Sequence, residues 1–376
     1  MTFAAFYFLA LIPLVVGGLL WWFDRRYTVW EWALNSAVAF IVAGIMHWSV
    51  AAGMTADEEV WSGEITRVEY RPEWRERYKE AIYRTETYRT GVGKNRRTHT
   101  RRVFSHYETR HATHPDRWTA FSNIDLSLSI SRAKYDELVR KLGAQVQSRR
   151  GDRSTMKTGS THVGGDPNDY FVQNTSRYVE PVIKGVAFEN RVKASPSVFS
   201  YAPLTPEEAN RLPDYPGAAD SWRSNRVFAS PIDTYKWDQM MGRLGPHKMV
   251  NLIIARMPSP AEARKLEAKW VGGKKNDLVL TYGDGWSYVF GWTEQARVKR
   301  ELETLLITKP VTDAILSDID RIVRAHYKPV GWHKFDYLDL KPRAKHVWLL
   351  VVIMVLTQAG AICLGLFNGA DKKTVQ

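Results

Sequence analysis

The sequence predicts a membrane-anchored protein of mixed α+β and α/β class, with three transmembrane helices flanking a soluble domain. Three apolar runs, at residues 3–23, 29–54 and 347–367, predict these helices. Each run is long enough to cross a hydrocarbon layer of about 30 Å at about 1.5 Å per residue. Strand and helix patterns alternate within residues 225–330, which predicts an α/β sandwich. The chain should therefore contain a soluble domain that is tethered to the membrane at both ends.

The first two apolar runs are expected to form a helical hairpin over residues 1–54. A cleaved signal peptide is the alternative for the first run, but no Lys or Arg precedes it and a second run follows at once. Glu31, Asn35 and His47 are expected near an interface or against a neighbouring helix, because lipid disfavours them. Four tryptophans flank the short link and favour the headgroup layer: Trp21, Trp22, Trp30 and Trp32.

The orientation of the hairpin follows from the distribution of positive charge. The hairpin tip and the tail at 368–376 carry Arg25, Arg26, Lys372 and Lys373. Five cations stand near the membrane on the domain side: Arg67, Lys334, Lys341, Arg343 and Lys345. Short loops weigh more than the edges of long domains. We therefore expect a multi-pass protein of the inner (cytoplasmic) membrane, with an extracytoplasmic soluble domain.

Composition and motifs exclude several kinds of site. The only cysteine, Cys363, lies in the third apolar run, which excludes an intrachain disulfide and a thiolate zinc site. The sequence has no nucleophile elbow, phosphate loop, dinucleotide fingerprint or helical zinc motif. An enzyme whose residues meet only in three dimensions stays open, but the sequence favours a non-enzymatic role, and no cofactor is expected.

Residues 55–224 form a β-rich, loop-rich basic region. Residues 60–70 alternate like an edge strand. Residues 131–142 predict a helix that Ser131 opens and Gly143 closes. Residues 148–169 are rich in Gly, Ser, Thr and Asp without apolar periodicity, which predicts a mobile loop. Prolines recur in residues 195–216, which predicts a surface connector with one short helix after Thr205.

A basic patch lies within the same region. Residues 85–90 and 103–109 alternate on either side of Gly91 and Gly93, which predicts an exposed hairpin. The patch consists of Arg89, Lys94, Arg96, Arg97, Arg101, Arg102, Arg110 and Arg117. A solvated hairpin, a surface for anionic lipid and a surface for nucleic acid are the three interpretations. Nucleic acid is disfavoured, because no known binding motif is present.

Four histidines in the patch are weak candidates for metal ligands. They are His99, His106, His111 and His114. Their spacing is not that of a helical zinc site, so ligands would have to meet across the hairpin. Exposed or hydrogen-bonded imidazoles are the simpler interpretation.

The pattern in residues 225–330 is regular. Strands are expected at 225–230, 248–256, 277–282 and 287–292. A helix at 231–244 should end at Gly245, a second should begin at Ser259-Pro260, and two more should follow the last strand. A juxtamembrane connector, residues 331–346, leads to the third apolar run.

Several segments resemble an uncharacterised family of phage-encoded membrane proteins. The resemblance extends from the two N-terminal apolar runs to the Gly-Gly-Lys-Lys-Asn-Asp segment 272–277, and includes Trp61-Ser62-Gly63, 194–199 and 224–227. Members of that family have a cysteine-rich insert where this sequence has residues 91–114 without cysteine. A metal or disulfide role of that insert therefore does not carry over.

A second resemblance, over about residues 225–306, is to TPM domains, which are membrane-tethered α/β modules, some of them phosphatases. It implies a ligand site at the turn formed by Gly272, Gly273, Lys274, Lys275, Asn276 and Asp277. Asp277 could help to hold a hard cation, whereas the two lysines favour an anion. The structural alternative is a tight turn in which the glycines end a helix and Asp277 begins a strand.

The leading functional hypothesis is a non-enzymatic, membrane-anchored phage or prophage protein whose soluble domain binds a partner at the cell envelope. The expected partners are the lipid bilayer and an envelope protein, and a homo-oligomer is compatible with the sequence. Two alternatives stay open: a TPM-like metal-dependent phosphohydrolase, and a membrane-tethered binder of anionic lipid or nucleic acid.

Overall fold

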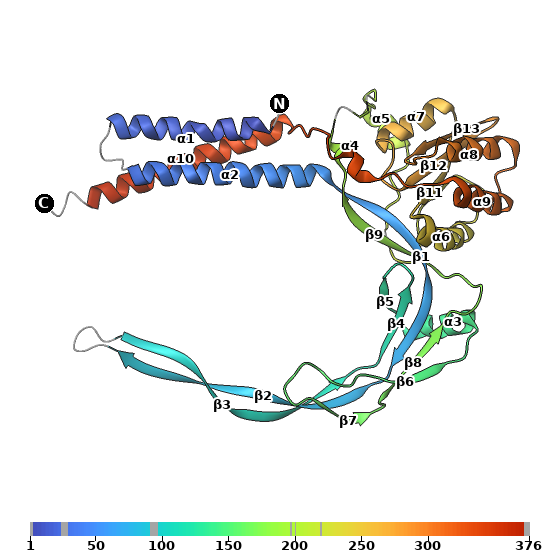
Figure 1. The fold of residues 1–376 in the computed structure, drawn as a ribbon, viewed down its shortest axis with the longest axis horizontal. Coiled ribbons are helices and arrows are strands. Elements are labelled where there is room, and N and C mark those ends of the chain that lie inside the picture. Colours follow the sequence, from blue (N-terminus) through green and yellow to red (C-terminus); the bar gives the residue numbers. More distant parts are fainter. Residues whose placement is uncertain are drawn as a thin grey trace.

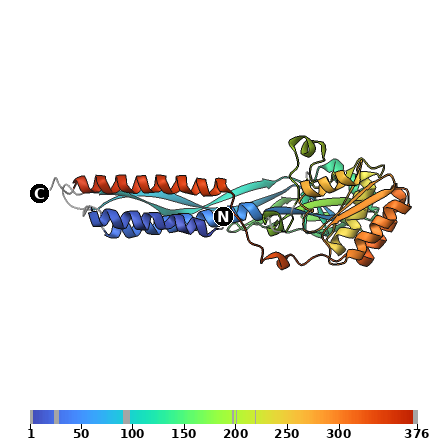
Figure 2. The same cartoon turned by 90° about the horizontal axis from the view of Figure 1, so that it is seen from above.

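The computed structural model describes residues 3–23, 29–90, 97–195, 198–199, 201–218 and 220–371. A helical bundle extends from one side of an α/β unit, and a long two-stranded arm extends in the same direction below it, so that the molecule has the shape of a C (Figure 1). Seen from above, the arm lies behind the bundle along its length (Figure 2). The long strand β1 connects these parts.

Three helices form the bundle: α1 (Ala4–Phe23), α2 (Val29–Thr55) and α10 (Ala344–Asp371). Small side chains, including Ala10, Ala39 and Ala43, are fully buried where the helices touch. Within the described residues, Trp32–Thr55 is long and apolar enough to cross a membrane, whereas Ala4–Leu19 and Ala344–Thr357 are shorter apolar stretches. Among the described residues, one helix is thus both long and apolar enough to cross a membrane, where the sequence predicts three such spans.

Strand β1 (Ala56–Arg71) follows α2 directly and belongs to an antiparallel sheet. Its first half pairs with β9, and its second half lies between β4 and β8. The other strands are β4 (Arg117–Ser122), β5 (Ser127–Ser129), β6 (Gln147–Arg150), β8 (Asn168–Gln173) and β9 (Pro181–Glu189), in the order β5-β4-β1-β8-β6. The expectation of an edge strand at 60–70 is therefore wrong for residues 67–70, which have a strand on each side. Alternation of apolar and polar residues indicates that one face of a strand is covered. It does not indicate how many strands pair with that strand.

Helix α3 (Arg132–Leu142) covers one face of this sheet. The side chains of Leu138 and Leu142 pack with Ile65, Val68 and Val172 in a buried cluster. The hydroxyl of Ser131 caps the first turn and Gly143 ends the helix in a left-handed conformation. The predicted boundaries are confirmed, because local capping chemistry determines them.

The prediction of a loop at 148–169 holds for residues 151–160 and is wrong at both ends of the segment, which form strands. The segment contains β6 and β7 (Thr161–Gly165). Arg153 is buried, and its Nη1 donates to Asp169 Oδ1 at 2.8 Å. The hydroxyls of Thr155 and Ser160 donate to Glu76 Oε2 at 2.9 and 2.6 Å. This segment is held in place by polar contacts with residues that are distant in the sequence. A search for apolar periodicity cannot detect such contacts.

The arm consists of β2 (Trp74–Thr90) and β3 (Arg97–His114), paired in antiparallel fashion over their whole length. Strand β7 pairs only with the first residues of β2, up to Arg77. A bulge interrupts the register between Ile82 and Tyr83. The predicted hairpin is confirmed and is longer than expected. Its turn, which includes Lys94 and Arg96, lies outside the described residues.

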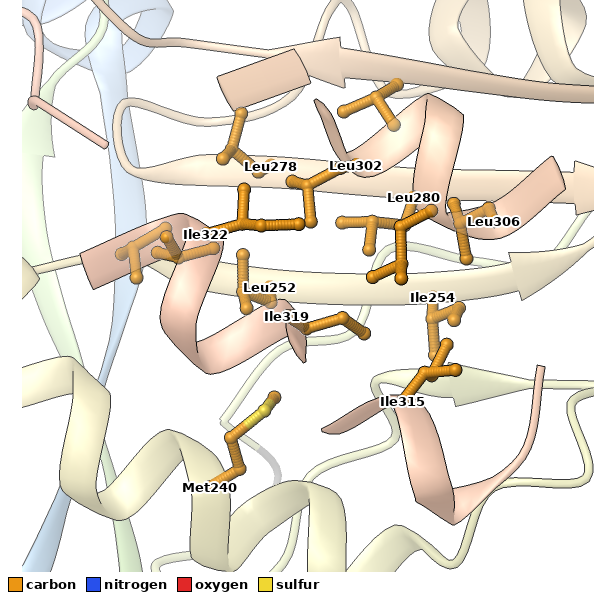
Figure 3. Packing of buried hydrophobic residues seen from close by; sticks show 14 of the residues in the cluster. Met240, Leu252, Ile254, Leu278, Leu280, Leu302, Leu306, Ile315, Ile319 and Ile322 are labelled. Carbon is orange, nitrogen blue, oxygen red and sulfur yellow. The ribbon is translucent and has the colours of Figure 1, made fainter. Parts of the chain in front are cut away.

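The α/β unit contains a second sheet, in the order β10-β11-β12-β13. Its strands are β10 (Val227–Phe228), β11 (Asn251–Arg256), β12 (Asp277–Gly283) and β13 (Trp286–Gly291), and only β13 is antiparallel. Helices α6 (Thr234–Lys248), α8 (Ala296–Thr308) and α9 (Leu316–His326) cover one face (Figure 3). Helix α7 (Pro260–Lys269) covers the other face, beside the segment that contains α5 (Pro206–Arg211).

These elements confirm the predicted alternation of strands and helices. The short helix α4 (Arg191–Ala194) precedes the predicted connector at 195–216. The connector contains α5 as its one helix among the described residues, and Leu212 packs beneath α7. Two 3-10 helices, Asp313–Ile315 and Trp332–Phe335, precede α9 and α10.

Candidate functional site

The turn at 272–277 connects α7 to β12. Gly272 and Gly273 have φ angles of +76° and +84°, a conformation that a Cβ atom disfavours. Trp270 ends the helix and Asp277 begins the strand. The local geometry is thus that of the structural alternative, a tight turn between helix and strand.

Asp277 is completely buried in this turn. One carboxylate oxygen, Oδ1, accepts hydrogen bonds from the Tyr215 hydroxyl at 3.0 Å and from Asn251 Nδ2 at 2.8 Å. The other, Oδ2, accepts the backbone N–H of Lys274 at 2.7 Å. Burial raises the pKa of Asp277 to about 6. A carboxylate enclosed in this way cannot contact a substrate or a hydrated cation without rearrangement of the turn.

The two lysines of the turn contact strand β1. Lys274 Nζ lies 3.1 Å from Asp57 Oδ1 and 4.3 Å from the centre of the Tyr215 ring. Lys275 Nζ lies 3.4 Å from Glu59 Oε1. The two lysines are therefore neutralised by two carboxylates of the same chain. No local pattern in the sequence indicates that Asp57 and Glu59 contact this turn.

Backbone contacts complete the docking of the turn onto β1. Asn276 Nδ2 donates to the carbonyl of Val60 at 2.9 Å. The amides of Asn276 and Asn251 are buried, and their Oδ1 atoms have no hydrogen-bond partner. The turn is thus a buried polar contact between the α/β unit and β1.

The turn also lies at the edge of the sheet where ligands are rare. Asn251 and Asp277 are the first residues of the parallel strands β11 and β12. In parallel sheets, ligands bind beyond the carboxyl ends of the strands. At that opposite end, Arg256 Nη2 pairs with Asp284 at 3.1 Å on the surface. The position of the turn does not favour a phosphohydrolase centred on Asp277.

The segments that carry the family resemblance meet at the same junction. Arg226 Nη1 donates to Ser62 Oγ at 2.7 Å. Phe199 packs against Gly272 and lies edge-on to Trp292, with ring centres 5.8 Å apart. These motifs therefore share a structural task, which is to join β1 to the α/β unit.

Helix α6 contributes two glycines to the junction. A Cβ atom at Gly245 would lie 2.3 Å from the carbonyl oxygen of Ser62, and one at Gly242 would lie 2.9 Å from that of Gly63. The backbone of α6 therefore packs directly against the backbone of β1, with no side chain between them. The prediction that Gly245 ends this helix is wrong, because the residue serves close packing and α6 continues to Lys248.

Two clefts adjoin these elements. One of about 270 Å³ beside the turn is lined by Asp57, Lys193 and Lys269, among others. Its lysines are paired, Lys193 with Asp57 at 3.8 Å and Lys269 with Asp214 at 2.8 Å. A second cleft of about 940 Å³ lies where the helical bundle meets the soluble domain.

The basic patch follows the arm. Arg101 and Arg84 pair with Glu86 at 3.1 and 2.9 Å, and all three side chains are exposed or partly exposed. The guanidinium of Arg102 lies 5.2 Å from the centre of the Tyr83 ring. Arg89 and Arg97 are exposed near the tip.

The remaining described members of the patch lie towards the base. Arg110 pairs with Glu80 and Glu108 at 3.1 and 2.7 Å. Arg117 lies beyond the arm, at the start of β4. The described members of the patch are thus divided between the outer half of the ribbon, with Arg89, Arg97, Arg101 and Arg102, and its base, with Arg110.

The four candidate histidines do not converge. His99 stacks on Tyr88, and His106 is hydrogen-bonded to Ser105. His111 lies opposite Arg77. His114 Nε2 is 3.0 Å from Glu76 Oε1 at the base of the arm. Across the part of the chain that the structure describes, no three His, Cys, Asp or Glu residues are grouped as metal ligands.

Comparison with known proteins yields no match to a family model, to a curated protein or to a solved structure.

Proposed function

We propose that this chain is a non-enzymatic, membrane-anchored phage or prophage protein whose soluble part binds a partner at the cell envelope through the β2–β3 arm. Three helices hold it in the inner membrane, and the soluble part faces away from the cytoplasm. The observation that carries the proposal is the arm, a long ribbon whose described residues beyond Arg77 belong to none of the buried hydrophobic clusters.

The outer surface of the bundle supports the membrane anchor. Large apolar side chains on all three helices face outwards, among them Ile12, Ile41, Ile45, Val352 and Val355. Each would gain about 1.5–3 kcal/mol by leaving water. The small residues at the helix contacts match packing in lipid, where close backbone approach replaces the hydrophobic effect.

Exposed tryptophans mark both ends of the bundle. Trp22, at the end of α1, and Trp30, at the start of α2, belong to one end of the bundle. Trp48, in the second half of α2, and Trp348, near the start of α10, belong to the other, and each of the four is about 70–85% exposed. Along α2, Trp30 and Trp48 are separated by about 27 Å at 1.5 Å per residue. This spacing fits two headgroup layers on either side of a hydrocarbon core of about 30 Å.

The shape of the arm supports a binding role. Tyr83, Phe104 and Tyr107 are each about half exposed although they are large aromatic residues. Beyond Arg77, β2 has no second strand beside it in the described structure. A two-stranded ribbon is marginally stable in water, so a binding partner would stabilise the extended arm.

Labelling of introduced cysteines tests the anchor and its orientation. In a Cys363→Ala background, Met156→Cys places a thiol on a fully exposed soluble site, and Thr374→Cys places one in the tail. We expect a membrane-impermeant maleimide to label residue 156, but not residue 374, in intact spheroplasts. Labelling of residue 374 alone would reverse the orientation.

Phosphatase assays test the non-enzymatic part of the proposal. The purified protein should not hydrolyse phosphomonoesters with or without divalent cations, because Asp277 is enclosed. Hydrolysis that is lost in Asp277→Ala, while Asp284→Ala at the exposed end of β12 retains it, would replace this proposal with the phosphohydrolase.

A further inference from the structure

We propose that the cleft where the helical bundle meets the soluble domain binds a membrane phospholipid whose headgroup carries a primary ammonium group, of the phosphatidylethanolamine class. The inference rests on the proposed membrane anchor and names a ligand for a site that this anchor places at the membrane surface. Three observations carry it: the position of the cleft, the two kinds of wall that line it, and the charges on its soluble side.

The cleft lies at the level where the bundle would leave the membrane. It has a volume of about 940 Å³ and is lined by Ala52 and Thr55 near the end of α2 and by Ala56 at the start of β1. Trp48, which belongs to the tryptophans at this end of the bundle, also lines it. The juxtamembrane connector leads from the soluble domain into α10 at the same end of the bundle (Figure 1). A phospholipid of the adjoining leaflet can therefore reach the cleft without leaving the membrane.

The cleft has an apolar wall and a charged wall. The bundle contributes apolar side chains, among them Phe3, Trp48 and Ala52. The connector contributes residues 336–341, in which charged side chains stand between apolar ones. Tyr337 is 78% exposed although it is a large aromatic residue, and such rings favour the headgroup layer. An apolar surface beside a few polar groups is suited to a phospholipid, which joins acyl chains and a headgroup in one molecule.

The charges that β1, β9 and α4 contribute to the cleft are paired within the chain. Asp57 Oδ1 lies 3.1 Å from Lys274 Nζ, and Arg191 Nε donates to Glu189 Oε1 at 2.8 Å. Arg191 Nη1 donates to the backbone carbonyl of Asp336 at 2.8 Å. Arg191 therefore holds the backbone of the connector and leaves its carboxylates to other partners.

The charges of the connector are available to a ligand. Asp336, Asp339 and Lys341 are exposed and form no ion pair with any other residue that the structure describes. Two carboxylates and one ammonium group thus line the same cleft without a partner. A headgroup with one ammonium and one phosphate is their complement, because its ammonium can donate to the carboxylates while its phosphate accepts from Lys341.

The same charges select among phospholipids. A phosphatidylglycerol headgroup brings a negative charge and no cation for the two carboxylates. A choline headgroup is cationic but has no N–H group, so it cannot donate a hydrogen bond to a carboxylate; its preferred contacts are aromatic faces. Phosphatidylcholine is therefore the reference lipid that isolates the role of Asp336 and Asp339.

Native mass spectrometry of the full chain tests the inference. The protein is released from nanodiscs that contain equal amounts of phosphatidylethanolamine, phosphatidylcholine and phosphatidylglycerol with matched acyl chains. We expect phosphatidylethanolamine to be retained in preference to each of the others by about tenfold, the value of one hydrogen bond to a charged group. Equal retention of the three lipids would overturn the proposal and leave the anchor intact. A lipid-free dimer would assign the cleft to a second copy of the chain and also overturn it.

Three charge variants assign the parts of the headgroup. Asp336→Asn with Asp339→Asn should reduce the preference for phosphatidylethanolamine over phosphatidylcholine to about one. Lys341→Gln should reduce retention of both lipids and leave their ratio unchanged, because both carry phosphate. Asp214→Asn with Asp284→Asn makes the same change in charge at side chains that are 97% and 95% exposed outside the cleft, and it should retain the preference. Loss of the preference in both pairs of aspartate variants would indicate an effect of net charge and overturn the proposal.

Filling the cleft provides a test that does not depend on charge. Ala52 is exposed in the apolar wall, so Ala52→Trp should occupy the space and reduce the retained phosphatidylethanolamine. Ala37→Trp makes the same substitution at an exposed position of α2 outside the cleft, and it should retain the lipid. Equal retention in the two variants would overturn the proposal. Failure of the native chain to enter nanodiscs would overturn the anchor and, with it, this inference.

Discussion

Two basic segments of this protein, the turn at 272–277 and the β2–β3 arm, have opposite structural roles. The lysines of the turn meet carboxylates of β1 and form a buried contact. Arg84 and Arg101 of the arm share Glu86 and are largely exposed to water. The comparison shows that basic residues mark a binding surface only when no distant segment of the chain neutralises them.

The difference in exposure determines the energetics of the two segments. Glu59, the partner of Lys275, is 3% exposed, whereas Glu86, the partner of Arg101, is 32% exposed. Surface pairs contribute about 0–1 kcal/mol, but removal of one partner of a buried pair costs about 3–5 kcal/mol. Substitutions should therefore destabilise the turn far more than the arm.

Lys275→Glu is the change with the largest expected effect. It places a second carboxylate beside Glu59 and should lower stability by about 3–5 kcal/mol, or roughly 10 °C in the melting temperature of the soluble part. Thermal unfolding of the detergent-purified protein measures the change. Lys236→Glu, at the more exposed pair with Asp313, is the matched control. Equal losses of stability in both variants would mean that the Lys275–Glu59 pair is no more buried than an ion pair on the surface.

The sequence predicts the elements whose boundaries depend on local chemistry. Ser131 and Gly143 bound α3, and Ser259 caps α7, because a cap needs only residues three or four positions away. The contacts of the turn depend instead on Asp57 and Glu59, more than two hundred residues earlier in the chain. The same reason explains the failed expectation at 148–169, where Glu76 supplies the partner of Ser160.

Asp277→Asn tests whether the turn is a buried structural contact. Burial raises the folded-state pKa of Asp277 from 3.8 to about 6. The unfolded chain therefore ionises first, and this group lowers stability as pH rises from about 4 to about 6, by about 3 kcal/mol in total. Asn does not titrate, so the stability of the variant relative to the native protein should improve by that amount between pH 4 and pH 7. Melting temperatures across this range measure it.

The matched control for this pH dependence is Asp284→Asn, at the exposed end of the same strand. Its stability relative to the native protein should stay nearly constant over the same range. A flat difference for Asp277→Asn as well would mean that water reaches the carboxylate, and the turn would again be a candidate ligand site.

Arg101→Glu with Arg102→Glu should have the smallest effect on stability. Both side chains belong to a ribbon that packs against no core, so the melting temperature in a zwitterionic detergent should change by the equivalent of about 0.5 kcal/mol or less. Retained stability would show that these arginines serve no structural contact, in contrast to the lysines of the turn, which stabilise the fold. A large loss of stability would instead mean that the arm packs against another part of the protein, and the contrast between the two basic segments would fail.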